Sequence, residues 1–171
     1  PLRRRVFRWA LGVGSAFEYA NRTGRQVGPA LKLQHALADR LVLSKIREAV
    51  GGDKRFFSAG GAPLAKDIEE FFLSVGLLVC QGYGLTETSP MVTCNSPGAF
   101  RFGTVGRPIP GCEVRIGDAG EVQVRGDNVM KGYWGKPAET AAAFENGWFK
   151  TGDVGVLDPD GFLRIPDRIK D

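Results

Sequence analysis

The chain has 171 residues, of which 43% are hydrophobic and 25% are charged, an ordinary globular composition that argues against disorder and low complexity. No apolar run reaches the roughly 18 residues that a membrane-spanning helix needs. Three cysteines without zinc-site spacing and a single histidine argue against a disulfide framework, a histidine metal cluster and a Ser-His-Asp triad. We expect a protein of a reducing cytosol and, because the chain starts with Pro1 and ends in a charged run, a piece of a longer one.

The positive charge is concentrated at the front of the chain. Residues 1–55 carry twelve Lys and Arg against four Asp and Glu, whereas the remaining residues carry eleven against fifteen. A basic segment can contact nucleic acid, anionic lipid or an acidic partner, although a solvated helix face is the commoner reason for such a run. No RNA-binding aromatic motif or zinc finger accompanies the charge, so we expect no nucleic-acid partner.

Two helices are predicted first. Residues 3–20 and residues from about Ala30 to Val50 have apolar side chains at spacings of three and four. Gly51 and Gly52 supply the C-terminal stop of the second helix. Its apolar stripe consists of Leu33, Leu37 and Leu41, with Ala38, Val42 and Ile46 beside it. His35 lies within this pattern and is interpreted as a residue of the helix face.

A strand-helix-strand unit follows. Arg55–Ala59 and Leu77–Cys80 are short apolar runs, and Leu64–Val75 between them has helical spacing. Such a βαβ unit implies parallel strands that are buried by helices. Because two strands alone make a poor sheet, the unit is expected to belong to a larger α/β sheet.

The chain from about Thr104 is predicted to be a small, mostly antiparallel β region. Glu121–Arg125 alternates apolar and polar residues with period two, as a half-buried strand does. The other expected elements are a partner strand at Cys112–Ile116, a short helix at Pro137–Phe144, and strands at Val154–Leu157 and Phe162–Ile165 around a turn.

The stretch Gln81–Thr88 suggests chemistry, since it follows a predicted strand at the sheet edge where open α/β sheets bind ligands. Its glycines allow close approach of a ligand, and Tyr83 offers a flat face to a base. Thr86 offers a hydroxyl to a phosphate, and Glu87 offers the hard carboxylate oxygen that Mg²⁺ prefers. A glycine-rich turn with Thr and Glu is nevertheless common, and alone it decides little.

Three further segments strengthen this interpretation. The loop Ser58–Leu64 ends the preceding strand, and adjacent strand ends lie side by side in a right-handed βαβ unit, so the two loops could form opposite walls of a pocket. The carboxylate of Thr151-Gly152-Asp153 could accept ribose hydroxyls. Asp167–Asp171 is the fourth segment. Singly, the triplet is more often a turn and the charge run is more often solvated.

In this order, GGAPL, QGYGLTE, WFKTGD and DRIKD resemble the adenylate-forming, AMP-forming acyl-CoA synthetases, from about Arg55 to Asp171. Gly126–Trp134 resembles another stretch of that family, and the helical front is similar to the long-chain fatty-acid–CoA ligase branch. The resemblance implies an α/β fold in two parts. Residues 1–100 would be a helical segment plus the βαβ part of the large N-terminal domain with its helix-flanked, largely parallel sheet. Residues 101–171 would be a small antiparallel β-barrel-like subdomain that ends at the interdomain hinge.

The resemblance also implies roles for individual residues. Thr86 would bind the α-phosphate, Glu87 would bind magnesium, and Lys170 would lie at the hinge; these three form the implied catalytic set. Asp153 and Arg168 would hold the ribose hydroxyls. Tyr83 would stack on the adenine base. The remaining cofactor-binding residues, around the adenine, would be Gly60, Gly61, Ala62, Pro63, Gln81, Gly82 and Gly84.

The implied activity is ATP-dependent conversion of a long-chain fatty acid to an acyl-adenylate and then to acyl-CoA, with release of pyrophosphate and AMP. ATP/AMP, Mg²⁺ and coenzyme A are the implied cofactors and substrates. We expect a cytoplasmic ligase that contacts a membrane peripherally through Arg3–Arg8 with Phe7 and Trp9, and homo-oligomers are left open. The family's phosphate loop and C-terminal lysine domain are not found in these residues, so the piece is expected to be inactive alone.

Two alternatives remain open. The same nucleotide motifs serve other adenylate-forming ligases, which activate aryl or amino acids. A nucleotide-binding module without catalysis would also carry them.

Overall fold

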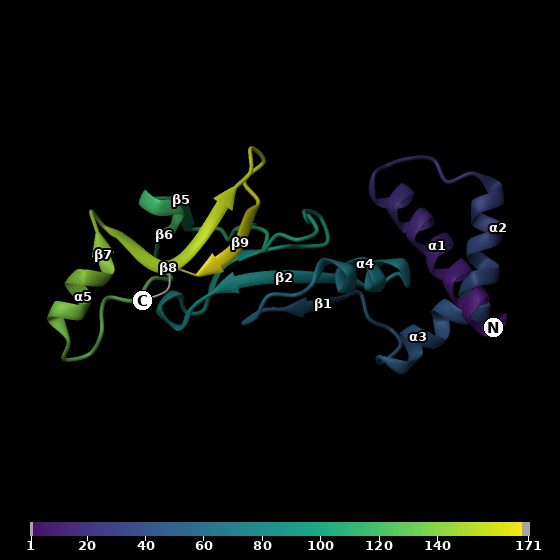
Figure 1. Cartoon of the computed structure of the whole chain (residues 1–171), viewed down its shortest axis with the longest axis horizontal. Helices are drawn as coiled ribbons and strands as arrows, with labels where there is room; N and C mark the ends of the chain where they lie inside the picture. Colours follow the sequence, from purple (N-terminus) through teal and green to yellow (C-terminus); the bar gives the residue numbers. More distant parts are fainter. Residues whose placement is uncertain (1, 169–171) are drawn as a thin grey trace. The chain divides into compact units, whose positions relative to one another are not determined.

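The computed structural model describes residues 2–168, except for the side chains of residues 167 and 168. The chain divides into two compact units (Figure 1). One unit contains the residues up to Phe57 together with Leu64–Val79, and the other contains Ser58–Pro63 together with the residues from Cys80 onward.

The first unit is helical. Its elements are α1 (Leu2–Arg22), α2 (Pro29–Ala38), a π-helical turn η1 (Asp39–Leu43), α3 (Ser44–Ala49) and α4 (Lys66–Ser74). Its core is formed by Ala10, Val13, Ala38, Leu43, Val75 and Leu77. No helix in the described part of the chain is both long enough and apolar enough to cross a membrane. The predicted helices are thus confirmed, except that the second is interrupted by η1.

A glycine decides how closely α1 packs against α4. A Cβ built on Gly14 would lie 1.9 Å from the carbonyl oxygen of Ser74, so any larger residue would push the two segments apart. Arg47 caps the same end of α4, because its Nη1 donates to the Val75 carbonyl at 2.9 Å. His35 lies on the helix face, where its ring stacks on Phe17 at 3.8 Å between centroids.

The core-facing side of the second helix follows the flanking residues of the predicted stripe, since Ala38 is buried and Val42 and Ile46 pack against the core. Leu33, Leu37 and Leu41 are exposed in the described chain, Leu33 to 74%, whereas Ala38 and Leu43 are fully buried. The π-helical turn explains the difference, because its extra residue rotates the following side chains by about 100°. Leu43 therefore continues the buried face in place of Leu41.

The first sheet has the strand order β1 (Phe56–Ala59), β2 (Leu78–Gly84), β3 (Met91–Cys94) and β4 (Arg107–Pro108). β3 pairs antiparallel with both β2 and β4, and neither β3 nor β4 was predicted. A Cβ on Gly60, just after β1, would lie 3.3 Å from the carbonyl oxygen of Gly82 in β2. The carboxyl ends of β1 and β2 therefore lie next to each other, as the βαβ prediction requires.

The second sheet is antiparallel and five-stranded. Its strand order is β5-β6-β8-β7. β7 pairs with residues 148–149 of β8, and β9 pairs with residues 153–157 of the same strand. The strands are β5 (Cys112–Ile116), β6 (Glu121–Gly126), β7 (Phe144–Glu145), β8 (Trp148–Leu157) and β9 (Leu163–Arg168), and the helix α5 (Pro137–Ala143) precedes β7. Strands of this sheet share a hydrophobic core with β3, which contributes Val92. The other buried members of this core are Cys112, Val122, Val124 and Leu163. The predicted α/β class with a small antiparallel β part is confirmed.

Candidate functional site

The glycine-rich motif lies inside β2. Gln81–Gly84 belongs to the strand rather than to a loop after it, which corrects the sequence prediction. A Cβ on Gly84 would lie 1.6 Å from the Pro90 carbonyl oxygen, and one on Gly82 would lie 2.9 Å from the Met91 sulfur. The segment Pro90–Met91 of the same chain therefore comes close to these two glycines. Their contact with a nucleotide stays a prediction.

The loop after β1 adjoins this motif at Gly60. Gly60, Gly61, Ala62 and Pro63 are exposed, and Gly61 has φ +80°, in the left-handed region that favours glycine. Both glycine-bearing segments therefore come from adjacent strand ends. The sequence predicted this adjacency, while a pocket with these two segments as its walls stays a prediction.

Tyr83 and Asp153 meet, although 70 residues separate them in the sequence. The Tyr83 hydroxyl donates to Oδ2 of Asp153 at 2.6 Å. Asp153 is buried in β8, where its backbone N–H contacts the Thr151 hydroxyl at 3.2 Å. Two residues assigned to the base and to the ribose are thus neighbours in the fold.

The Thr151-Gly152-Asp153 triplet lies within β8, not in a turn. The Thr151 hydroxyl donates to the Val122 carbonyl at 2.8 Å, and the Gly152 N–H donates to the Glu121 carboxylate at 3.0 Å. Asp153 lies opposite Arg168 in the register of β8 and β9. The Arg168 side chain and Lys170 lie outside the described residues.

Thr86 and Glu87 lie on a short 3₁₀ turn, η2 (Thr86–Thr88), directly after β2. Thr88 fixes this turn: its buried hydroxyl accepts from the Leu85 N–H at 2.9 Å and lies 2.8 Å from the Pro90 carbonyl oxygen. Thr86 is exposed and Glu87 is half-buried. The turn therefore presents a hydroxyl and a carboxylate beside the carboxyl end of β2.

The loop between β6 and α5 contributes two residues to which the sequence assigned no role. Asn128 Nδ2 donates to the carbonyls of Thr88 and Met91 at 3.2 and 2.8 Å. The Tyr133 hydroxyl donates to Oε1 of Glu87 at 3.0 Å. Burial, then the hydrogen bond to Glu87 and the charge of that carboxylate, raise the pKa of Tyr133. The family-like stretch Gly126–Trp134 was the only signal that could have pointed to them.

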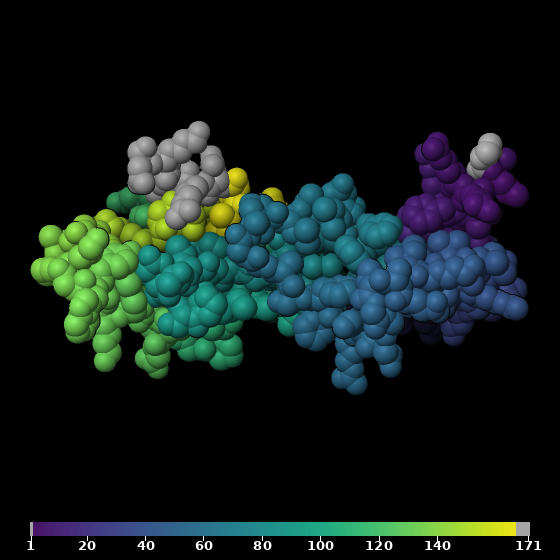
Figure 2. Space-filling view, turned by 90° about the horizontal axis from the view of Figure 1, so that it is seen from below, coloured from purple at the N-terminus to yellow at the C-terminus, as the bar shows by residue number. Residues whose placement is uncertain are grey.

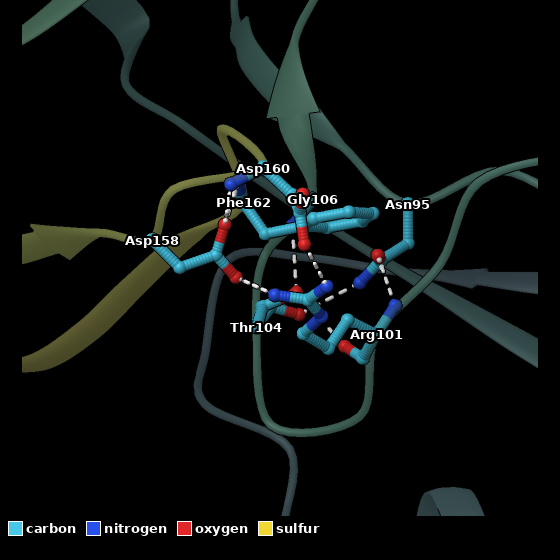
Figure 3. Close-up of polar contacts among 7 residues, drawn as sticks. All are labelled: Asn95, Arg101, Thr104, Gly106, Asp158, Asp160 and Phe162. Atoms are coloured by element: carbon cyan, nitrogen blue, oxygen red, sulfur yellow. Dashed lines mark hydrogen bonds and ion pairs between the residues drawn. The ribbon is translucent and has the colours of Figure 1, made fainter.

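A polar cluster holds the loop before β4 against the β8–β9 turn (Figure 3). Arg101 pairs with Asp158 and, at 2.6 Å, with Asp160, and its guanidinium lies 4.7 Å from the Phe162 ring centroid. Asn95 accepts from the Arg101 N–H at 3.0 Å, and its own backbone N–H donates to the Gln81 carbonyl at 2.8 Å. The cluster thus connects the β8–β9 turn to β2, the strand that contains the glycine-rich motif.

The donor set fits magnesium bound together with a nucleotide. Among the described residues, no group of three or more His, Cys, Asp or Glu side chains could hold a metal ion alone. Mg²⁺ at phosphate-transfer sites keeps several waters and needs only one or two carboxylates besides the substrate phosphates. Glu87, with the Thr86 hydroxyl beside it in sequence, satisfies that requirement.

Comparison with known proteins decides the family. The model of the family described as "AMP-binding enzyme" matches residues 10–134. The chain belongs to this family. The long-chain-fatty-acid–CoA ligase FadD15 of Mycobacterium bovis is 44% identical over 169 residues, which are 98% of this chain and 28% of that protein. The feruloyl-CoA synthase of an Amycolatopsis species is 40% identical over 129 residues, 68% of this chain and 26% of that protein.

A solved structure of the same kind is also similar. The o-succinylbenzoate CoA synthetase of Bacillus subtilis, in complex with its acyl-adenylate intermediate, superposes with a TM-score of 0.65 at 35% identity. The match covers 74% of this chain and 29% of that one. The chain therefore spans less than a third of the length of these relatives.

Proposed function

We propose that the complete protein carrying this chain is a long-chain fatty-acid–CoA ligase that works through an acyl-adenylate. The observation that carries the proposal is the Tyr83–Asp153 contact at 2.6 Å, which brings the candidate base and ribose residues together beside the turn of Thr86 and Glu87. The 44% identity with FadD15 across nearly the whole chain supports the acid class.

The proposed roles follow from the chemistry of each side chain. The Tyr83 ring stacks on adenine next to Gly60–Pro63 and Gln81–Gly84, and the Asp153 carboxylate accepts the ribose hydroxyls, with Arg168 opposite in the sheet register. The Thr86 hydroxyl donates to an α-phosphate oxygen. The Glu87 carboxylate holds Mg²⁺, which when bound supplies positive charge that offsets the phosphate charges. Lys170, as part of the catalytic set, is assigned to the hinge.

In the first step, an oxygen of the fatty acid carboxylate bonds to the α-phosphorus of ATP, and the bond from that phosphorus to the bridging oxygen breaks, releasing pyrophosphate. In the second step, the coenzyme A thiol loses its proton and attacks the acyl carbonyl, and AMP leaves. Residues on η2 and β8 hold the nucleotide through both steps. Positioning and charge stabilisation, rather than covalent chemistry by the protein, are the contribution of these residues.

A second candidate is an aryl-acid ligase. The 40% identity with feruloyl-CoA synthase favours it, over a shorter part of the chain. The nucleotide site would be the same, because only the acid pocket distinguishes the two classes.

The experiment is ATP–pyrophosphate exchange by the complete protein with Mg²⁺ and a panel of fatty, aryl and amino acids. We expect exchange with long-chain fatty acids. We expect Glu87→Gln to lower it roughly tenfold or more, because the amide lacks the charge of a magnesium-binding carboxylate, and loss of a partner that merely orients such a ligand already costs about tenfold to a hundredfold. Glu113→Gln is the matched control, since Glu113 pairs with Arg125 at 2.7 Å on the exposed side of β5 and β6. Exchange with aryl acids alone selects the second candidate. No exchange with any acid contradicts both and indicates a nucleotide-binding module.

We further propose a cytoplasmic enzyme that touches anionic membrane through the start of α1, with residues 1–100 and 101–171 as parts of the large domain and of a β subdomain. The side chains of Leu2, Arg3, Arg4, Arg5, Phe7, Arg8 and Trp9 are exposed. Figure 2 shows this helix, in purple, at the surface of its unit. Such a pairing of aromatic and cationic side chains suits a lipid headgroup layer.

A further inference from the structure

The loop between β6 and α5 donates two hydrogen bonds to Glu87. Its Met130 N–H donates to the Glu87 carbonyl at 2.7 Å, and its Tyr133 hydroxyl donates to the Glu87 carboxylate at 3.0 Å. Asn128 adds a third contact to η2, through the Thr88 carbonyl at 3.2 Å. The main chain and the side chain of one carboxylate residue are therefore held by the same loop.

Tyr133 is itself placed by α5. The Tyr133 N–H donates to the Thr140 hydroxyl at 2.9 Å, and that hydroxyl donates to the Lys136 carbonyl at 2.7 Å. A Cβ on Gly132 would lie 2.6 Å from the Thr140 side chain, so the loop passes α5 at a distance that glycine permits. The phenol therefore starts from a fixed backbone position rather than from a free loop.

A hydrogen bond of this kind has a defined effect on a carboxylate. A glutamate side chain has three rotatable torsions, and a partner on one oxygen restricts the direction of the other oxygen. Hydrogen-bonded partners of metal-binding carboxylates orient them for the ion in the same way. A phenol suits this role because it donates without adding charge that would compete with the cation.

We propose that Tyr133 is a positioning residue that fixes the Glu87 carboxylate in the orientation that binds the Mg²⁺ of MgATP. The inference rests on the proposed function, since it takes Glu87 as the magnesium ligand. It adds that the loop from Asn128 to Tyr133, which Thr140 holds in place, determines the Mg²⁺ concentration that the enzyme needs for half-maximal activity. Tyr133 does not touch the reacting atoms.

The test is a binding measurement on the complete protein, without any acid substrate. Isothermal titration gives the affinity for MgATP, and for AMP in the presence of a chelator. We expect Tyr133→Phe to weaken MgATP binding threefold to tenfold and to leave AMP binding unchanged, because AMP binding under chelation needs no metal. The Mg²⁺ concentration for half-maximal ATP–pyrophosphate exchange should rise by a similar factor. Thr140→Val, which leaves the phenol in place but frees its backbone, should give a smaller shift in the same direction.

Matched variants separate the possible failures. Tyr19→Phe is the control, since it removes the same group from an exposed residue of α1. If Glu87→Gln does not weaken MgATP binding, the magnesium assignment in the proposed function is wrong. If Glu87→Gln weakens it and Tyr133→Phe does not, or tightens it, the positioning role alone is overturned. Equal loss of MgATP and AMP binding in Tyr133→Phe also overturns it, because this would indicate a general distortion. In the Glu87→Gln background, Tyr133→Phe should add nothing.

Discussion

Tyr83 has two groups that can serve separate purposes. Its ring is assigned to the adenine base, while its hydroxyl donates to Asp153 at 2.6 Å. The hydroxyl uses one carboxylate oxygen and so restricts the direction of the other. If Asp153 accepts the ribose hydroxyls, the phenol hydroxyl matters for ribose recognition and not for stacking.

Removing only the hydroxyl should therefore affect only ribose recognition. We expect Tyr83→Phe to weaken AMP binding roughly threefold to tenfold, the factor that a hydrogen bond of about 1 kcal/mol gives. The same variant should bind 2′,3′-dideoxy-AMP as well as the wild type does. Calorimetric titration of both nucleotides measures this.

Tyr83→Ala completes the comparison, because it also removes the ring. Stacking of a base on an aromatic side chain contributes about 1–3 kcal/mol, so this variant should weaken both nucleotides. Equal weakening of AMP and of the dideoxy nucleotide by Tyr83→Phe would show that the hydroxyl does not act through the ribose.

The β8–β9 turn is the clearest case at the scale of an element. Asp158 Oδ1 accepts from the N–H groups of Asp160 and Phe162, each at 2.9 Å, and Oδ2 pairs with Arg101. Burial alone would raise the pKa of Asp158. The Phe162 N–H, the charge of Arg101, the Asp160 N–H and the Arg101 hydrogen bond together outweigh it, so the pKa is lowered.

The sign of the pH dependence follows from this lowered pKa. The stabilisation from Asp158 is fully present above the unfolded-chain value of about 3.9 and is lost as pH falls through the lower folded value. We therefore expect Asp158→Asn to lower the melting temperature at pH 7, with the gap to the wild type closing as the pH falls below about 4. Thermal unfolding over a pH series measures it.

Asp160→Asn is the matched control for this turn. Asp160 pairs with Arg101 at 2.6 Å, but within residues 2–168 its carboxylate has no backbone contacts like the two of Asp158, and exposed ion pairs contribute little. Its effect should be smaller. A gap between Asp158→Asn and the wild type that stays constant down to acidic pH would show that the carboxylate charge is not responsible.

At the scale of the whole molecule, the distribution of charge matters most. Residues 1–55 carry the excess of positive charge, and α1 begins with four arginines beside exposed Phe7 and Trp9. Phe7 is 40% exposed and Trp9 is 37% exposed. Aromatic side chains next to cationic ones are suited to the boundary between headgroups and acyl chains.

We expect the complete protein to co-sediment with anionic vesicles and not with neutral ones. Changing Arg3, Arg4, Arg5 and Arg8 to Gln should weaken this binding at least tenfold, since each basic side chain near an anionic surface contributes about 1 kcal/mol. Added salt should also weaken the binding of the wild-type protein to anionic vesicles, because it screens the charges.

The control removes four positive charges elsewhere. Lys32, Arg40, Lys45 and Lys54 are exposed residues of the same unit, and their change to Gln gives the same net charge. An equal loss of vesicle binding in both variants would assign it to net charge rather than to α1.

Much of the element order was predictable from the sequence, because helical spacing and strand alternation act over a few residues. Glu121–Arg125 was predicted by its period of two, and β6 covers Glu121–Gly126. β3 and β4 were missed because strands of four and two residues are too short to show an alternating pattern. The spacing of Leu33, Leu37 and Leu41 did not show that they are exposed while Ala38 and Leu43 are buried, because periodicity does not reveal the extra residue of a π-helical turn.

By itself, the sequence determined the class of fold, the family-like motifs and the candidate residues, since backbone preferences and motif residues are local properties. Only the tertiary structure decided which residues those candidates meet. Tyr83 reaches Asp153 across 70 residues, and Tyr133 reaches Glu87 across 46. Such contacts depend on strand register and on how closely segments pack at Gly84 or Gly132, which no short window of sequence specifies. The hydrogen bonds from the β6–α5 loop to Glu87 are therefore determined by the tertiary structure.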